Sequence, residues 1–128
     1  MLFRSVKPDS RRFGLEIHHG IDIGAARGST VRPAAWGFVS AAGYDEALGN
    51  YVRVSHALGA STLYAHLERV QVRRGAFVVP GLSALGSVGS TGRSTGPHLH
   101  FGCYLGPQAL PPRLFLAFHS ARRGLLGF

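Results

Sequence analysis

The sequence is short of cysteine, and this scarcity removes several kinds of protein from consideration. Cys103 is the single cysteine, so no disulfide can form within the chain, and a metal site built on two or more thiolates is excluded. We expect Cys103 itself to be a small buried residue. The chain also lacks an apolar run long enough to span a bilayer, and residues 1–4 lack the apolar stretch of a secretory signal. No export route is therefore visible in this sequence.

Acidic residues are scarce too, at 6 against 14 lysines and arginines, which gives a formal net charge of +8. Such a surface attracts polyanions over a long range, and salt weakens that attraction. Nucleic acid, anionic cell-wall polymers and anionic membranes are all compatible with this charge. A nucleic-acid surface, however, interleaves aromatic with basic side chains. The pairs Arg73-Arg74 and Arg122-Arg123 have no such neighbours, so we do not expect a specific nucleic acid partner.

Glycine, by contrast, is abundant, with 18 residues scattered among β-branched side chains. Glycine tolerates the positive φ angles of tight turns, so this mixture favours a turn-rich β fold. Strand-like runs recur about every ten residues, which is typical of an all-β sandwich or barrel rather than of alternating β and α units. We therefore predict a mainly β protein, a compact antiparallel sheet or sandwich, with strands near residues 29–32, 37–41, 51–56, 61–67, 70–72 and 76–79.

The length of 128 residues suits one domain with a hydrophobic core of its own. We expect a polar and basic arm at residues 1–11, the folded domain at residues 12–106 and a tail at residues 107–128. A Gly/Ser/Thr loop at residues 87–97 leads into His98. This loop differs from a phosphate-binding loop because it lacks the terminal lysine and because a β segment follows it. Nucleotide binding is therefore not indicated.

Seven histidines are many for a chain of this size, and their spacing indicates chemistry. His18 and Asp22 are four residues apart, so they can converge on one face of an extended segment if Gly20 lets it bend. His98 and His100 are two residues apart and share a face for the same reason. Two histidines and one carboxylate are the protein ligands of a catalytic zinc site, which keeps an open position for water.

His66 supplies a further imidazole on a strand-like run. Proton transfer and oxyanion stabilisation both need such groups within hydrogen-bond reach of the substrate. Each histidine taken alone is more often a structural or surface residue. Their combination in this order along the chain is far more specific.

The chain resembles the lysostaphin/LytM family of zinc metallopeptidases (peptidase family M23), which cleave the peptide part of bacterial peptidoglycan. The resemblance extends over about 70% of the chain, up to the end of the His-Leu-His-Phe element. The segments that carry it are His18-His19-Gly20-Ile21-Asp22, Gly49-Asn50-Tyr51, Thr62-Leu63-Tyr64-Ala65-His66 and Ser94-Thr95-Gly96-Pro97-His98-Leu99-His100-Phe101.

The resemblance implies a role for each matching residue. It implies that the Zn²⁺ ligands are His18, Asp22 and His100. It implies that the catalytic pair beside the metal-bound water is His66 and His98. It also marks three positions as structural, or as supporting the ligands from behind: Asn50, Thr62 and Tyr64. The family fold is compact, mostly antiparallel β, with the metal at the floor of a narrow groove.

Two other histidines and two departures from the family pattern bear on these expectations. His19 is expected to face away from the site, because successive strand side chains face opposite ways, and His56 is expected to make a structural hydrogen bond. Gly102 stands where an acidic residue is common, and residues 26–28 replace the usual Ala-Pro-x-Gly turn. Neither departure removes a metal ligand, so they bear on substrate preference and rate.

Together these features predict a zinc-dependent endopeptidase that hydrolyses peptide bonds in peptidoglycan. Such an enzyme is expected to be a monomer in the periplasm, in the cell wall or outside the cell, with its basic surface drawn to anionic wall polymers. The alternative is a non-catalytic LytM-like domain that binds the wall or activates other wall hydrolases. Relatives of that second kind typically lack one or more ligand positions, whereas all five expected site residues, the three ligands and the catalytic pair, are present here. A nucleic-acid-binding module, suggested by charge alone, is the third hypothesis.

Overall fold

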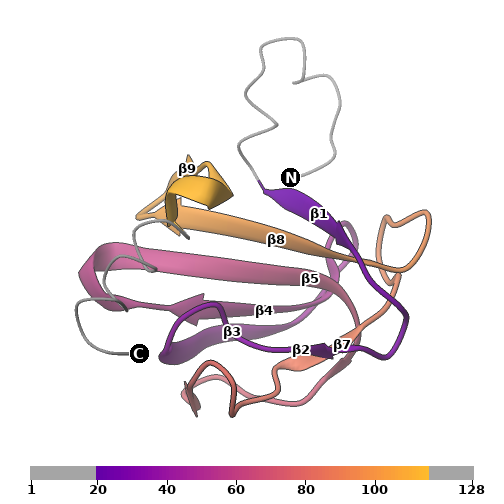
Figure 1. The fold of residues 1–128 in the computed structure, drawn as a ribbon, viewed down its shortest axis with the longest axis horizontal. Helices are drawn as coiled ribbons and strands as arrows, with labels where there is room; N and C mark the ends of the chain where they lie inside the picture. Colours follow the sequence, from indigo (N-terminus) through magenta and orange to yellow (C-terminus); the bar gives the residue numbers. More distant parts are fainter. Residues whose placement is uncertain (1–19, 116–128) are drawn as a thin grey trace, which may run out of the picture.

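The computed structural model describes residues 20–115, which form one antiparallel sheet (Figure 1). Neighbouring strands follow the order β1-β8-β5-β4-β3-β6, and the shorter strands β2, β7 and β9 pair beside this path. The strands are β1 Ile21–Gly24, β2 Thr30–Val31, β3 Gly37–Asp45, β4 Gly49–Ser55, β5 Ala60–Val70, β6 Phe77–Val78, β7 Gly86–Val88, β8 His98–Leu105 and β9 Gln108–Leu110, and a 3₁₀ turn spans Ala57–Gly59. The predicted mainly β antiparallel fold is confirmed.

One face of the sheet carries the hydrophobic core. A row of four paired residues, Val39, Val54, Thr62 and Cys103, crosses four adjacent strands, and none is more than 2% exposed. Alternate residues along a strand face opposite sides, so this row fixes the core face of the whole sheet. Burial raises the pKa of the Cys103 thiol to about 12, so the thiol stays protonated.

The same alternation places other residues on the opposite face of the sheet. Phe101 pairs with Tyr64 on the core side, so its neighbour His100 faces the other way, opposite Ala65. On its second side His100 pairs with Asp22 of β1. Figure 1 shows β8 lying between β1 and β5. A line of paired residues across three strands therefore brings a carboxylate and an imidazole together.

Several element bounds differ from the sequence-based expectations. The strand predicted at residues 70–72 does not form, because Val70 ends β5 and the two residues after it lie outside any strand. β8 extends to Leu105, well beyond the motif that predicted it, because β9 pairs with its far end. Residues 112–115 form a helical turn that buries Phe115 in the core. The expected boundary between domain and tail at residue 106 stays a prediction.

No helix in the described part of the chain, residues 20–115, is long and apolar enough to cross a membrane.

Candidate active site

Asp22 and His100 form the closest pair of polar side chains in the site. The Asp22 Oδ1 atom lies 2.9 Å from the His100 Nδ1 atom and 3.7 Å from the His98 Nε2 atom. His98 and His100 reach the same carboxylate because they are two residues apart on β8, as their spacing predicts. The two imidazoles are mostly shielded from water, whereas the carboxylate is more than half exposed. A carboxylate beside two shielded imidazoles is a donor set suited to a divalent transition metal.

Gly20 sets the orientation of the His100 ring. Its φ angle is +147°, which side-chain-bearing residues rarely adopt, and a Cβ at this position would lie 2.5 Å from the Phe101 carbonyl oxygen. The same Cβ would lie 2.9 Å from His100 Nε2. The backbone therefore packs directly against the Nε2 edge of the ring, and the Nδ1 edge faces the carboxylate of Asp22.

His66 reaches the cluster through a β-bulge. Asn50 pairs with Leu67 and Val52 with Tyr64, so β5 has one residue more than β4 between these two pairs. At this bulge His66 has a φ angle of +64°, in the left-handed region that non-glycine residues seldom occupy. Its ring lies 5.0 Å from the His98 ring between centroids. Regular alternation would send the side chain to the opposite face from Ala65, and the bulge redirects it.

Backbone carbonyls fix the tautomers of His66 and His98. The His66 Nδ1 atom is 2.7 Å from the Thr91 carbonyl oxygen, and the His98 Nδ1 atom is 2.8 Å from the Gly96 carbonyl oxygen. A carbonyl oxygen only accepts hydrogen bonds, so each Nδ1 carries the proton and donates it. The Nε2 atom of each ring is left as the position that can accept or donate a proton in a reaction.

The pKa of His66 is lowered, chiefly because burial disfavours the charged imidazolium. The neighbouring imidazoles of His98 and His100 lower this pKa further. The hydrogen bond to the Thr91 carbonyl and the charge of Asp22 act in the opposite direction. Burial prevails, so His66 is predominantly neutral at pH 7.

The described residues supply part of the predicted metal site. Asp22 Oδ1 and His100 Nδ1 are 2.9 Å apart, against roughly 3.3 Å for two ligands of one tetrahedral Zn²⁺. Their chemistry and spacing fit a shared ion. Within residues 20–115 no group of three or more His, Cys, Asp or Glu side chains is placed to hold a metal. His18 and His19 lie outside the described residues, so the third ligand stays a prediction.

Thr62 and Tyr64 belong to a buried chain of hydrogen bonds on the core side. The Ala34 N–H donates to the Tyr64 hydroxyl oxygen at 2.9 Å, and this hydroxyl is 2.8 Å from that of Thr62. The Thr62 hydroxyl is 2.9 Å from His56 Nε2, and His56 Nδ1 is 2.8 Å from the Trp36 carbonyl oxygen. The structural hydrogen bonding expected of His56 is present.

A model of peptidase family M23 matches residues 16–112 of this chain. The chain belongs to peptidase family M23. Its recognised motifs and its antiparallel sheet agree with that membership, and the first ligand position predicted from sequence, His18, lies inside the matched range.

Two curated relatives are similar to this chain over a fraction of their own length. The chain is 44% identical over 96 residues to the DD-carboxypeptidase/endopeptidase Mpg of Neisseria meningitidis serogroup B, covering 75% of this chain and 22% of that protein. It is 39% identical over 87 residues to the peptidoglycan DD-endopeptidase ShyC of Vibrio cholerae, covering 68% of this chain and 20% of the relative. The chain thus spans about a fifth of the length of these relatives.

Solved M23 structures share the fold. The catalytic domain of the antimicrobial peptidase lysostaphin from Staphylococcus simulans superposes with a TM-score of 0.73 at 32% identity, covering 78% of this chain and 79% of that one. A zinc-containing peptidase from Vibrio cholerae superposes with a TM-score of 0.69 at 32% identity, covering 73% of this chain and 28% of that one. These likenesses establish the lysostaphin-type sheet, and zinc-containing structural relatives point to a metal.

The structure brings together three of the imidazoles that the sequence singled out, those of His66, His98 and His100, but sequence reasoning missed the groups that orient them. The carbonyl oxygens of Thr91 and Gly96 hold two rings, and the backbone of Gly20 packs against a third. Every residue has the same main-chain atoms, so a sequence motif could not predict which of them contact the rings. The available signal was the Gly/Ser/Thr loop immediately before His98, whose composition indicates a tightly folded backbone.

Proposed function

We propose that this chain is a zinc-dependent endopeptidase domain that hydrolyses peptide bonds in bacterial peptidoglycan. The observation that carries the proposal is the cluster on one sheet face, where Asp22 and His100 form the ligand pair and two further imidazoles stand beside them. Membership of family M23 and the likeness to ShyC and to a zinc-containing peptidase support it. The proposed ligands of the ion are His18, Asp22 and His100.

Zn²⁺ held by these ligands supplies Lewis acidity and lets a water ionise near neutral pH. The residues of the chain provide the proton handling. His66 and His98 each commit the Nδ1 proton to a carbonyl, so the Nε2 atom of one of them can accept the proton that the attacking water gives up. The Nε2–H of that ring would hydrogen-bond to the oxyanion and would then pass the same proton to the leaving amine. Because burial keeps His66 neutral at pH 7, it starts the cycle able to accept.

The proposed substrate is the peptide of peptidoglycan, which places the domain in the cell envelope. The chain has 14 basic against 6 acidic residues, so anionic wall polymers are proposed to concentrate near it. This contact would weaken as salt is raised, because exposed charges separated by more than about 8–10 Å are screened at physiological ionic strength.

The test compares wild type with His100→Ala on purified muropeptides. Mass spectrometry is expected to show shortened or separated peptides with wild type, and at least 1000-fold slower product formation with the variant, since a ligand of the ion is lost. Elemental analysis is expected to give about one zinc per wild-type chain and clearly less in the variant.

His19→Ala serves as the matched control, because it removes an imidazole adjacent in sequence to a proposed ligand while keeping the ligand set. It is expected to retain zinc and products. Identical products from wild type and His100→Ala would refute the metallopeptidase assignment. Wall binding by a zinc-free wild-type protein without products would instead support the non-catalytic alternative.

A further inference from the structure

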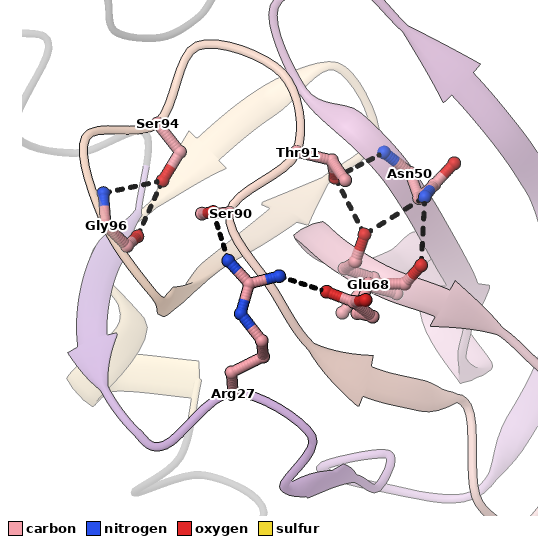
Figure 2. A network of polar contacts seen from close by, with 8 residues as sticks. Arg27, Asn50, Glu68, Ser90, Thr91, Ser94 and Gly96 are labelled. Carbon is pink, nitrogen blue, oxygen red and sulfur yellow. Dashed lines mark hydrogen bonds and ion pairs between the residues drawn. The ribbon is translucent and has the colours of Figure 1, made fainter.

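One short loop contacts both His66 and His98, the two imidazoles of the site that are not proposed metal ligands. Residues 90–96 (the 90–96 loop) supply the Thr91 carbonyl to His66 and the Gly96 carbonyl to His98. Within the loop the Ser94 hydroxyl donates to the Gly96 carbonyl at 2.8 Å, which braces the second acceptor (Figure 2). Any shift of this loop therefore moves two hydrogen-bond acceptors at once, and with them two rings.

The Thr91 hydroxyl anchors the loop to the sheet. It donates to the Leu67 carbonyl at 2.7 Å and accepts the Asn50 backbone N–H at 3.0 Å. The Asn50 side-chain amide donates to the same Leu67 carbonyl at 3.1 Å, so three groups meet at one point of β4 and β5 (Figure 2). Leu67 directly follows His66 at the bulge. The anchor and the catalytic ring are thus attached to consecutive residues of β5.

The 90–96 loop packs closely against the backbone at Gly49. A Cβ on Gly49 would lie 2.4 Å from the Thr91 carbonyl carbon, and a Cβ on Gly92 would lie 2.3 Å from the Gly49 nitrogen. Contacts this short do not occur for real Cβ atoms, so the two backbones touch only because both positions are glycine. The hydroxyl of Thr91 therefore acts on a backbone that is already held at van der Waals distance.

Arg27 ties the outer side of the same loop. One guanidinium nitrogen is 2.6 Å from a carboxylate oxygen of Glu68, and the other is 3.2 Å from the Ser90 hydroxyl. Figure 2 shows the guanidinium lying between these two partners. The arginine and glutamate side chains are 56% and 44% exposed, so water weakens this ion pair. The Arg27 contacts are accordingly expected to hold the 90–96 loop less strongly than the Thr91 hydroxyl does.

We infer that Thr91 is a positioning residue for both His66 and His98: its hydroxyl fixes the 90–96 loop, and the loop fixes the Nδ1–H tautomer and the direction of both rings. The tautomers follow from the structure of the chain alone, whereas the effect on catalysis rests on the proposed function. The two parts are separated by measuring the rings directly as well as the reaction.

The direct measurement is long-range ¹H–¹⁵N correlation of the histidine side chains in the zinc-loaded chain at pH 8. In wild type, both His66 and His98 are expected to show a protonated Nδ1 and an unprotonated Nε2. Thr91→Val keeps the shape of the side chain and removes the hydroxyl. It is expected to shift the Nδ1 signals of both rings and to mix the tautomers, and Thr91→Ser is expected to restore them.

The kinetic measurement uses the same variants on muropeptides. Thr91→Val is expected to lower kcat about tenfold with KM unchanged, which is the scale of lost support around a metal site. Thr91→Ser should recover most of kcat, and Arg27→Ala should change it less than Thr91→Val. Thr30→Val, the same substitution at an exposed threonine of the neighbouring strand β2, is the matched control and should leave kcat unchanged.

Two results would overturn the inference. An Nε2–H tautomer for either ring in wild type contradicts it whether or not Thr91→Val folds. A folded Thr91→Val with both tautomers and ring signals unchanged contradicts it equally. If wild type shows the expected tautomers but forms no product, the inference about the loop holds and the proposed function fails.

Discussion

His56, which directly follows β4, and His66 of β5 are both mostly buried, and both donate Nδ1–H to a backbone carbonyl. They differ in what faces Nε2. In His56 the Thr62 hydroxyl lies 2.9 Å from Nε2, which completes a hydrogen-bond chain inside the core. In His66 the ring faces two other imidazoles, with centroids 5.0 and 6.1 Å away. One ring is satisfied by a hydroxyl, and the other stands in a cluster of titratable groups.

The comparison teaches that burial and a carbonyl partner do not by themselves mark a functional histidine. The His56 chain has a single direction: Ala34 N–H to Tyr64, Tyr64 O–H to Thr62, Thr62 O–H to His56, and His56 N–H to Trp36. Each group donates once to the next, so the chain needs a neutral imidazole. The structural role of His56 lies in this complete hydrogen bonding, and the chemical role proposed for His66 lies in its Nε2 atom, which no such partner occupies in the described residues.

His66→Ala is the sharpest way to break the comparison, and of the changes that test this pair of histidines we expect the largest effect from it. Loss of a positioned acid–base group should lower kcat on muropeptides by about 100-fold or more. The zinc content should stay at the wild-type value, because the proposed ligand set is intact. Unchanged kcat in a zinc-loaded variant would remove His66 from the reaction.

Thr62→Val tests the other side of the comparison, the structural role of the buried hydrogen-bond chain through His56. It keeps the side-chain volume while leaving the Tyr64 hydroxyl and His56 Nε2 without their shared partner in the core, so the free energy of unfolding should fall by about 1–3 kcal/mol. Urea denaturation measures the loss. At a temperature where the variant is fully folded, its kcat should equal that of wild type, and a tenfold drop would show that the chain supports catalysis directly.

Acid should weaken the fold through His56. Burial is the main cause that lowers its pKa in the folded protein, and the hydrogen bond to Trp36 only partly offsets it. The unfolded chain then takes up the proton first, so stability is fully present above about pH 6.5 and is lost as pH falls toward the folded pKa. One such group contributes a slope of at most about 1.4 kcal/mol per pH unit.

The control for this pH effect is His56→Gln, which cannot titrate. Unfolding free energies measured by urea between pH 5 and 8 should fall less steeply in this variant than in wild type. Parallel slopes for the two proteins would assign the acid sensitivity to other groups, including His66, whose pKa is lowered for the same reason.

The smallest expected effect isolates the backbone at the bulge. His66→Gly and His66→Ala both lack the imidazole, but only glycine adopts the φ of +64° without strain. His66→Gly should therefore be about 1 kcal/mol more stable than His66→Ala, as measured by urea denaturation. Equal stabilities would mean that the backbone relaxes once the ring is gone.

Much of the fold could be predicted from sequence, because alternation and glycine-rich turns are local signals. The strand near residues 61–67 is the middle of β5, and the one near residues 51–56 is β4 shifted by one or two residues. The ends could not be predicted, since pairing sets them. β8 continues to Leu105 because Ala60 and Ser61 of β5, distant in the sequence, pair with Leu105 and Tyr104.

The site divides in the same way. His98 and His100 share a face because they are two residues apart, and this follows from the sequence alone. Their meeting with Asp22 depends on the register between β1 and β8, which no local pattern encodes and which only the family resemblance implied. His66 reaches them through one extra residue in β5, which becomes visible only when both strands are aligned.

The buried chain through His56 also bears on how this protein can diverge. It holds the connection between β2 and β3 at two main-chain atoms, the Ala34 nitrogen and the Trp36 oxygen, and at neither residue does it use the side chain. Selection acting through this network therefore constrains the backbone path of the connection. It places little constraint on which side chains the residues of the connection carry. Proline at position 34 is the exception, because it has no hydrogen on nitrogen to give.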